Sequence, residues 1–345
     1  MKVGIMKSQI HALPSQLRKK CKKRAQPAFI APMLATLTDQ YFSSTEWIYE
    51  KKFDGIRILA FKKHGKVQLL SRNRLSYNHD FSIIVAELEK QKADNCILDG
   101  EVVALGKHGI SDFQLLQERK GKERITLVYN IFDLLYLDGY DICALPLLVR
   151  KQLLKKTLRY SSLLVYSKHT QKNGVTFFHY ACRHGWEGVM AKYGESTYVS
   201  RRSPDWLKFK CSERQELVIG GYTTPRGSRS YFGALLVGYY DDHDKLRYAG
   251  KVGTGYTQET LALVGHRLHK LHTKKCPFSD YDLATKDVQW VRPVIVGEFK
   301  FAQWTKGGKL RVGRFKGLRS DKRAKDVIRE LPMHERPKQQ RRKSR

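Results

Sequence analysis

The stretch Glu50-Lys51-Lys52-Phe53-Asp54-Gly55-Ile56-Arg57 decides how the rest of this chain is interpreted. If residues 47–54 form a β-strand, successive side chains alternate between its two faces. Glu50, Lys52 and Asp54 then share one face, and the aromatic side chains of the segment share the other. Those aromatic residues are Trp47, Tyr49 and Phe53. The aromatic face can therefore pack in a core while the other face is charged. This is typical of a strand beside a phosphate-binding cleft.

Lys52 is the predicted nucleophile of this strand. An amine attacks phosphorus only when it is unprotonated, and burial with the neighbouring cations Lys51 and Arg57 is expected to lower the pKa of Lys52. Gly55 allows a close approach of the backbone to a ligand. The alternative, an ordinary strand followed by an Asp-Gly turn, stays open on this stretch alone.

The charge of the chain points to a polyanionic partner. The sequence has 345 residues, of which 41% are hydrophobic, so two domains with separate cores are expected. Its 65 Lys and Arg residues outnumber 33 Asp and Glu residues, for a net charge of +32. Counterion release then favours nucleic acid, with an anionic membrane surface as the competing partner. Without a membrane-spanning run or signal peptide, a cytoplasmic protein is expected, associated with the nucleoid in a bacterium.

The cysteines and histidines carry no metal or nucleotide motif. The six cysteines lie far apart without a Cys-x-x-Cys pair, so they are predicted to be reduced thiols rather than zinc ligands or disulfides. They are Cys21, Cys96, Cys143, Cys182, Cys211 and Cys276. The absence of a His-Glu-x-x-His pattern and of a phosphate-binding P-loop disfavours a zinc protease and a P-loop ATPase.

The pattern of elements predicts an α+β fold in four segments. Residues 1–27 are predicted to be a basic arm, mobile or forming a short helix, and residues 332–345 a basic tail. Residues 28–213 combine strands with helices at 80–92, capped by Asp80, 146–158 and 175–184. Residues 214–331 contain short strands with glycine turns, the last at 294–301, and one helix at 257–271. This region fits a small OB-type barrel better than an SH3-like barrel.

Acids and lysines interrupt several of the predicted strands. Glu101 lies in the hydrophobic strand 97–105, where a carboxylate needs a partner or a metal, so it is a candidate Mg²⁺ ligand. The segments 187–192 and 206–210 carry an acid and three lysines. Lys208 and Lys210 share one strand face and would repel each other without an anion between them.

Taken in order, these segments resemble the covalent nucleotidyltransferases, and among them the ATP-dependent DNA ligases of the bacterial end-joining type. The resemblance covers residues 28 to about 330. The matching motifs are Lys52-Phe53-Asp54-Gly55 with Arg57, Ser71-Arg72-Asn73, Asp99-Gly100-Glu101, Phe132-Asp133-Leu134-Leu135, Glu187-Gly188-Val189-Met190-Ala191-Lys192, Trp206-Leu207-Lys208-Phe209-Lys210 and Arg319-Ser320-Asp321-Lys322. Gly313 departs from the family, which usually has proline there. The chain also resembles only the minimal two-domain catalytic core.

The resemblance implies an adenylation domain followed by an OB-fold domain, and a monomer that seals nicked or broken duplex DNA in DNA repair. Lys52 would take AMP from ATP, pass it to a 5′-phosphate, and let a 3′-hydroxyl displace it. An end-binding repair protein is a candidate partner. Mg²⁺, with Mn²⁺ as a substitute, would lie near Glu101 and Glu187.

The resemblance also gives roles to the nucleotide-binding residues. Glu50, Arg57 and Arg72 would lie at the nucleotide, and Phe132 and Lys192 at the adenine and phosphate region. Lys208 and Lys210 would offset phosphate charge, and Arg319 would face the pyrophosphate in a closed state. An RNA ligase or a capping guanylyltransferase of the same superfamily remains an alternative, as does a non-catalytic nucleic-acid-binding module.

Overall fold

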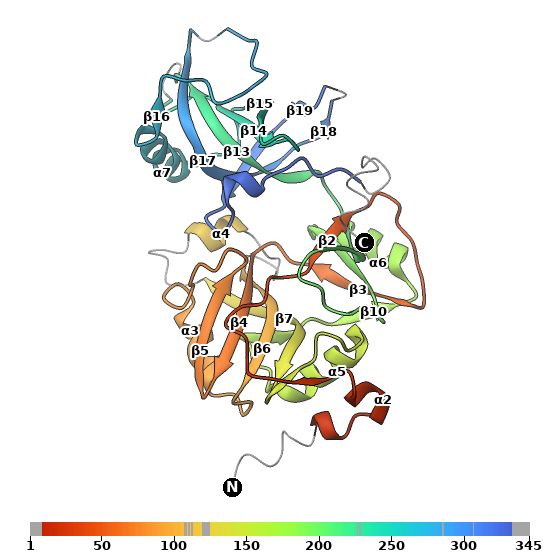
Figure 1. Cartoon of the computed structure of the whole chain (residues 1–345). Coiled ribbons are helices and arrows are strands. Elements are labelled where there is room, and N and C mark those ends of the chain that lie inside the picture. Colours follow the sequence, from red (N-terminus) through yellow and green to blue (C-terminus); the bar gives the residue numbers. More distant parts are fainter. Residues whose placement is uncertain are drawn as a thin grey trace. The chain divides into compact units, whose positions relative to one another are not determined.

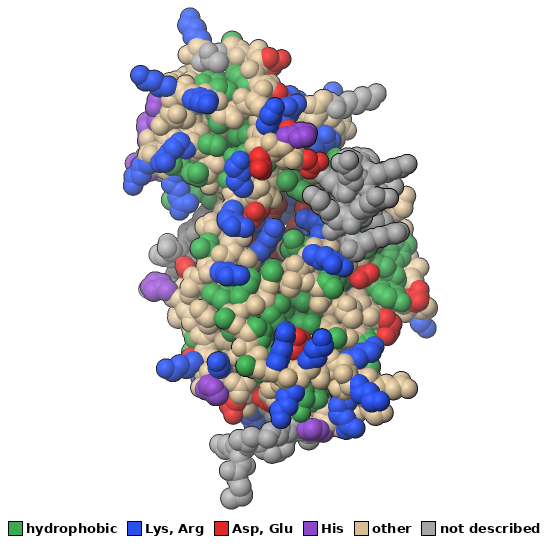
Figure 2. Space-filling model, in the orientation of Figure 1, with side chains coloured by type: hydrophobic (Ala, Val, Ile, Leu, Met, Phe, Trp, Pro, Cys, Tyr) green, Lys and Arg blue, Asp and Glu red, His purple; other side chains and the backbone are tan. Residues whose placement is uncertain are grey.

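The computed structural model describes residues 9–106, 109, 111, 113–118, 125–225, 227, 229–284, 286–305 and 307–332. The described chain forms two compact units (Figure 1). Unit 1 contains the residues up to Cys211 together with residues 331 and 332, and unit 2 is Ser212–Glu330. Lys and Arg side chains are spread over the visible face of both units (Figure 2).

The first sheet of unit 1, sheet A, has the strand order β1-β8-β7-β6-β4-β5, and β9 also pairs with β7. Its strands are β1 Lys22–Lys23, β4 Ile56–Lys63, β5 Lys66–Ser71, β6 Cys96–Leu105, β7 Thr126–Leu137, β8 Tyr140–Asp141 and β9 Leu164–Tyr166. Ile58 and Leu98 on one face pack in a common core with Ile84 and Leu88 of helix α3 (Ser82–Glu89). The short helix α4 is Phe113–Glu118.

The second sheet, sheet B, has the order β10-β3-β11-β12-β2. Its strands are β2 Leu34–Leu37, β3 Trp47–Lys52, β10 His169–Gln171, β11 Gly188–Tyr193 and β12 Arg202–Lys210. Helix α6 (Gly174–Arg183) covers one face, where Phe178 packs with Tyr49 and Phe209. The opposite face of sheet B is not covered by α6.

That opposite face packs toward sheet A. A shared core contains Leu59 and Phe132 of sheet A with Ile48 and Trp206 of sheet B. Helix α5 (Leu147–Thr157) places the buried side chains of Arg150 and Lys151 in unit 1. Because buried charges need partners, polar networks are expected between the two sheets.

Unit 2 is built around a six-stranded sheet of order β15-β14-β13-β17-β16, with β20 also paired to β17. Its strands are β13 Arg214–Thr223, β14 Leu235–Tyr240, β15 Leu246–Val252, β16 His272–Thr273, β17 Val288–Lys300 and β20 Arg314–Leu318, with the separate pair β18 Gln303–Trp304 and β19 Leu310–Arg311. Helix α7 (Gln258–His269) begins with a capping box between Thr257 and Thr260. The short helix η2 is Ala324–Asp326. Strands with one inserted helix agree with the predicted OB-type fold.

Some predicted boundaries were wrong. Strand β3 ends at Lys52 rather than residue 54, and the Asp54 N–H donates to the Ser111 hydroxyl at 3.3 Å. The N-cap of α3 is Phe81, without a side-chain hydrogen bond, rather than Asp80. Strand β17 begins at Val288, six residues before the predicted start, because it pairs with β13 on both sides of an irregularity.

Residues 9–27, predicted as a basic arm that is mobile or forms a short helix, contain the short helix but pack on unit 1 rather than standing apart from it. Ile10 is 1% exposed and belongs to the same core as Ile58, so the segment packs on unit 1. Helix α2 (Ser15–Arg18) is followed by β1, which pairs antiparallel with β8. Apolar side chains at positions 10, 13 and 17 reach this core, which a count of the cations did not reveal.

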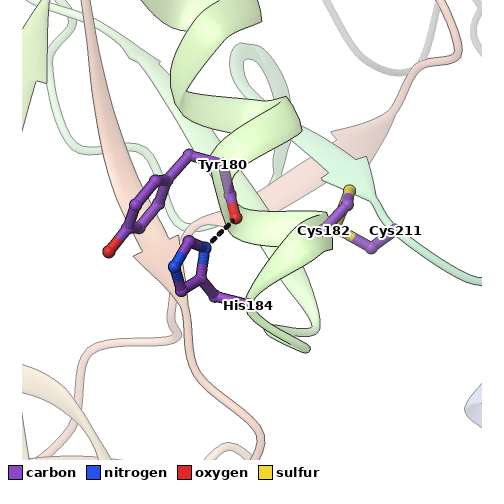
Figure 3. The surroundings of a disulfide bond; sticks show 4 residues. All are labelled: Tyr180, Cys182, His184 and Cys211. Atoms are coloured by element: carbon purple, nitrogen blue, oxygen red, sulfur yellow. Dashed lines mark hydrogen bonds between the residues drawn. A yellow bond between two sulfur atoms is a disulfide. The ribbon is translucent and has the colours of Figure 1, made fainter.

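The prediction that all six cysteines are reduced was wrong for Cys182 and Cys211, which form a disulfide (Figure 3). Cys182 lies in the last turn of α6 and Cys211 directly follows β12. Packing of α6 on sheet B brings their Cα atoms to 5.1 Å although 29 positions separate them in sequence. Cys21, Cys96, Cys143 and Cys276 are free. No helix in the described part of the chain is long and apolar enough to cross a bilayer.

Candidate active site

The register of sheet B brings the predicted site residues onto one face. Lys52 and Lys210 both lie opposite Gly188, and Glu50 and Lys208 both lie opposite Met190. In the next row of this face, Ile48 and Trp206 lie opposite Lys192. Since directly paired residues project to the same side, the strand-face predictions for Glu50 with Lys52 and for Lys208 with Lys210 are confirmed.

Lys52 forms an ion pair with Glu187, the residue just before β11. Burial lowers the pKa of Lys52, but the charge of Glu187, its hydrogen bond to the amine and the charge of Asp54 together outweigh burial, so the pKa lies above its ordinary value. The sequence-based prediction of a lowered pKa was therefore wrong for this state of the chain. Lys210 acts in the expected direction but more weakly. The Lys51 amine lies over the Trp186 ring, 4.7 Å from its centroid.

Glu50 holds two buried lysines. One carboxylate oxygen accepts from Lys151 of α5, and the other accepts from Lys192 at 2.7 Å. Burial raises the pKa of Glu50, but the two positive charges outweigh it, so the pKa is lowered. Burial lowers the pKa of Lys192. Lys151 was missed in the sequence, although its spacing from Leu147 and Leu154 places it on the inner face of a predicted helix.

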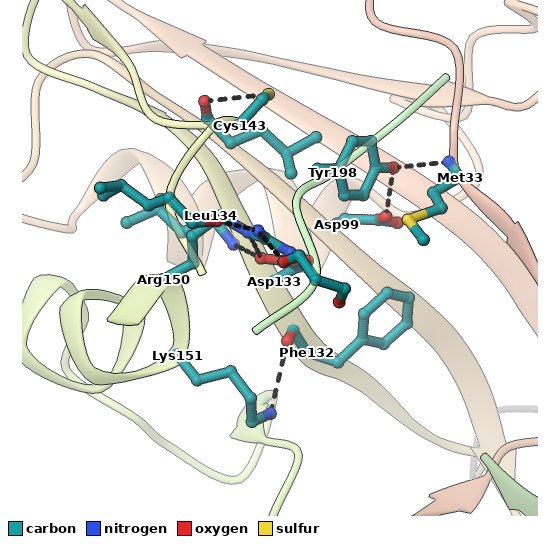
Figure 4. A network of polar contacts seen from close by, with 12 residues as sticks. Met33, Asp99, Phe132, Asp133, Leu134, Cys143, Arg150, Lys151 and Tyr198 are labelled. Atoms are coloured by element: carbon teal, nitrogen blue, oxygen red, sulfur yellow. Dashed lines mark hydrogen bonds and ion pairs between the residues drawn. The ribbon is translucent and has the colours of Figure 1, made fainter. Parts of the chain in front are cut away.

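Arg57 is held by a carboxylate of the neighbouring strand. Its Nε and Nη2 donate to Asp99 at 2.9 and 2.6 Å, and Nη1 donates to the Met33 carbonyl at 2.7 Å. The Tyr198 hydroxyl donates to the same carboxylate at 2.7 Å. Figure 4 shows Tyr198 between Met33 and Asp99. These partners fix the guanidinium of Arg57 in place.

A second buried pair supports the strand that carries Phe132. Arg150 donates through Nε and Nη2 to the two oxygens of Asp133, each at 2.9 Å (Figure 4). Lys151 also donates to the Phe132 carbonyl at 3.4 Å. Helix α5 therefore holds β7 at the carbonyl of the predicted adenine-stacking residue and at the side chain of the next residue, Asp133.

The Phe132 ring lies among aromatic and cationic groups. It contacts Trp206 edge to face, with centroids 6.1 Å apart. The Lys192 amine lies 4.2 Å from the Phe132 centroid and 4.1 Å from that of Trp206. Phe132 and Lys192, predicted to contact adenine and the phosphate region, are thus brought together.

Glu101 lies on sheet A, and Arg72 lies in the turn after its strand β5. Glu101 is half-buried and lies directly opposite Arg57 in the β4–β6 ladder, and Arg72 is half-buried in the turn after β5. No group of three His, Cys, Asp or Glu side chains within the described ranges could hold a metal ion. Glu101 and Glu187 fit Mg²⁺ only in the way common at nucleotide sites, where phosphate oxygens and water complete the coordination.

Arg319 belongs to unit 2 and is paired there. It donates to both oxygens of Asp321 and to Glu298, each at 2.9 Å, and Lys322 lies 3.2 Å from Glu216. In this state the Arg319 guanidinium is bound by carboxylates of its own unit.

Two family models match the chain, one within each unit. The ATP dependent DNA ligase domain matches residues 32–210, and the ATP dependent DNA ligase C terminal region matches residues 228–322. The multifunctional non-homologous end joining protein LigD of Pseudomonas aeruginosa is 41% identical over 335 residues, covering 93% of this chain and 39% of that protein.

Two further similarities come from mycobacteria. The multifunctional non-homologous end joining DNA repair protein LigD of Mycobacterium tuberculosis is 36% identical over 307 residues, covering 87% of this chain and 40% of that protein. A solved structure of mycobacterial DNA ligase D complexed with ATP and MES is 33% identical and has a TM-score of 0.64. It covers 87% of this chain and 98% of that chain. The chain thus spans well under half the length of these two curated relatives.

The first family match contains Lys52, Glu101, Phe132 and Lys192, and the second spans most of unit 2. This chain belongs to the ATP-dependent DNA ligase family.

Proposed function

We propose that this chain seals nicks in duplex DNA with ATP, through AMP bound covalently to Lys52. The observation that carries the proposal is the position of Lys52 on one sheet face with Lys208 and Lys210. Three amines on one sheet face can contact several linked phosphate groups of one ligand, which a single carboxylate could not match. The solved ligase D complex with ATP supports the choice of nucleotide.

In the first step, the Lys52 amine forms a bond to the α-phosphorus while the bond to the β-phosphate oxygen breaks and pyrophosphate leaves. The amine must first lose a proton, and Glu187 opposes that loss because it raises the pKa of Lys52. Engagement of Glu187 by another cation would weaken this ion pair. Mg²⁺, or Mn²⁺ in its place, held by Glu101 and Glu187, would supply that competing charge and stabilise negative charge on the phosphates.

The remaining residues position the nucleotide. Phe132 and Lys192 would contact the base region, while Arg57, fixed by Asp99, would bind the sugar side. Arg72 would lie near the nucleotide. We propose that Glu50 positions Lys192 and Lys151 rather than contacting ATP directly, because both of its carboxylate oxygens already accept from these lysines.

The later steps transfer AMP from Lys52 to the DNA and then release it. The 5′-phosphate of a nick would attack lysyl-AMP, forming a phosphoanhydride and breaking the bond from nitrogen to phosphorus. The adjacent 3′-hydroxyl would then attack the 5′-phosphorus and expel AMP. Lys208 and Lys210 would offset the negative charge in these steps. Arg319 would orient pyrophosphate in the first step only, after leaving its carboxylate partners.

The test is sealing of a labelled nicked duplex by the purified chain. We expect product with ATP and a divalent metal, none with GTP, and less with a nick between RNA strands. Preference for GTP would favour the capping enzyme, and preference for RNA would favour the RNA ligase. We further propose cytoplasmic action as a monomer in DNA repair, with an end-binding protein as partner. An absence of product with every substrate would contradict the proposal.

A further inference from the structure

Six cations gather where the described chain begins. They form what we call the N-terminal basic surface, composed of Arg18, Lys19, Lys20, Lys22, Lys23 and Arg24, all of them exposed. The end of helix α5 lies near the start of this segment, where Gln9 Nε2 donates to the Lys156 carbonyl at 3.5 Å. Lys155 and Lys156 are also exposed. In Figure 2, Lys and Arg side chains gather at the lower end of the view.

The surface is fixed to the body of unit 1. Ile10 and Cys21 lie in the core, and Lys22 and Lys23 pair with Asp141 and Tyr140 of β8. The Tyr136 hydroxyl donates to the Arg24 carbonyl at 2.8 Å. A ligand that binds here therefore avoids most of the entropy cost of ordering a mobile arm.

Its positive charge is largely uncompensated. Residues 9–38 contain no Asp or Glu. Arg24 pairs with Asp141, but no acid within the described ranges forms an ion pair with Lys19, Lys20, Lys22 or Lys23. Like charges held close together repel each other, so binding an anion here relieves that repulsion.

The surface lies at the end of sheet A away from the candidate active site. Arg57 pairs with Glu101 at one end of the β4–β6 ladder, and Lys62 pairs with Cys96 at the other. Leu137 pairs with both Cys96 and Tyr140, and Tyr140 in turn pairs with Lys23. The five residue steps from Arg57 to Lys62 span roughly 17 Å of strand. Phosphates bound around Lys52 are therefore not the ones that this surface would contact.

We propose that the N-terminal basic surface binds the sugar–phosphate backbone of a second stretch of duplex DNA, separate from the stretch held at Lys52. Clustered lysines and arginines suit backbone contacts that are independent of sequence. The choice of DNA over another polyanion rests on the proposed function. The surface would let one molecule hold two DNA segments.

The test uses the full chain with a short nicked duplex fixed on beads and a fluorescent intact duplex in solution. The variant replaces Lys20, Lys22 and Lys23 with Ala. The matched control replaces Lys66, Lys90 and Lys92, three exposed lysines of the same unit, of which Lys90 already pairs with Glu87. Thermal unfolding confirms that both variants fold, and a Lys→Arg triple at the first three positions serves as a charge-preserving rescue.

We expect the first variant to capture the second duplex at least about tenfold less than wild type, with the control and the Arg triple near wild type. Three lost phosphate contacts should reduce the slope of log affinity against log salt by about 2 to 3. Sealing of the short nicked duplex should stay within about twofold of wild type, so failure of the proposed function would show in that assay alone.

Other results would overturn the proposal. Equal losses in the variant and the control would mean that overall charge, not this surface, holds the second duplex. Unchanged capture by the variant, together with lost binding to phosphatidylserine vesicles or to an acidic peptide, would assign the surface to a different partner. A parallel loss of nick sealing would place these lysines in the primary DNA site.

Discussion

Lys52 and Glu187 form an ion pair at the end of sheet B, one from the last residue of β3 and one from the residue before β11. The pair raises the pKa of Lys52 despite burial, which favours the protonated amine. The proposed nucleophile is therefore in place, but its protonated amine cannot attack phosphorus. In the proposed mechanism, Glu187 would couple the binding of metal and phosphate to deprotonation of Lys52.

The first prediction concerns the two carboxylates proposed to hold Mg²⁺. Glu101→Ala and Glu187→Ala should each slow covalent AMP transfer, and excess Mg²⁺ or Mn²⁺ should partly restore it by mass action. We expect the larger restoration for Glu101→Ala, because loss of Glu187 also removes the partner of Lys52. The measurement is the rate of AMP transfer over a metal titration, with Glu46→Gln, at an exposed position, as control. Metal dependence identical to wild type in both variants would exclude a metal held by these carboxylates.

The second prediction separates structural from nucleotide-binding roles of Glu50. Glu50→Gln leaves Lys151 and Lys192 buried without a counter-charge, which should cost about 3–5 kcal/mol in the free energy of unfolding at pH 7. Urea unfolding measures this loss, and Glu46→Gln should cost almost nothing.

The pH dependence of that loss follows from the lowered pKa of Glu50. A carboxylate whose folded pKa is lowered stabilises the fold above its unfolded pKa and loses that contribution as pH falls through the folded value. The stability gap between wild type and Glu50→Gln should therefore narrow under acid conditions, below the ordinary glutamate range. A gap near zero at pH 7 would mean that Glu50 has no structural role.

The sequence predicted site contacts between residues of the same strand, but not contacts between segments that lie far apart in sequence. Alternation along a strand was enough to place Glu50 with Lys52 and Lys208 with Lys210. The sign of the Lys52 pKa shift was not accessible, because Glu187 lies 135 positions away and only the β3–β11 register brings it close. The partners of Arg57 were hidden for the same reason, since Asp99 and Tyr198 come from distant segments.

The third prediction concerns the disulfide, which sequence spacing did not suggest. Alkylation of the denatured chain without reductant should label four cysteines, and labelling after reduction should reach six. Closing a loop of this length should contribute about 3–4 kcal/mol to the free energy of unfolding. Mass spectrometry gives the count, and the Cys182→Ser variant, which frees Cys211, provides the control with five. Six labelled cysteines without reductant would contradict the pairing.

The fourth prediction assigns Arg319 to the first step. Arg319→Ala should slow AMP transfer from ATP by about 100-fold, the usual cost of losing one charge-stabilising donor, while sealing of a nick that already carries 5′-adenylate should fall much less. Arg323→Ala is the matched control, because Arg323 is an exposed arginine with a single carboxylate partner. Unfolding curves must accompany the rates, since the variant leaves Asp321 and Glu298 without Arg319. Equal losses on the two substrates would show that Arg319 does not act on pyrophosphate.

The most direct test of the whole account is covalent capture of AMP. The chain is incubated with α-labelled ATP and Mg²⁺ and then separated by denaturing electrophoresis. Wild type and Lys51→Ala should carry the label, because the Lys51 amine lies over Trp186 rather than beside Glu187. Lys52→Ala should carry no label. Its unfolding curve should show that the variant is still folded. Label on Lys52→Ala at the wild-type level would contradict the assignment of Lys52 as the nucleophile.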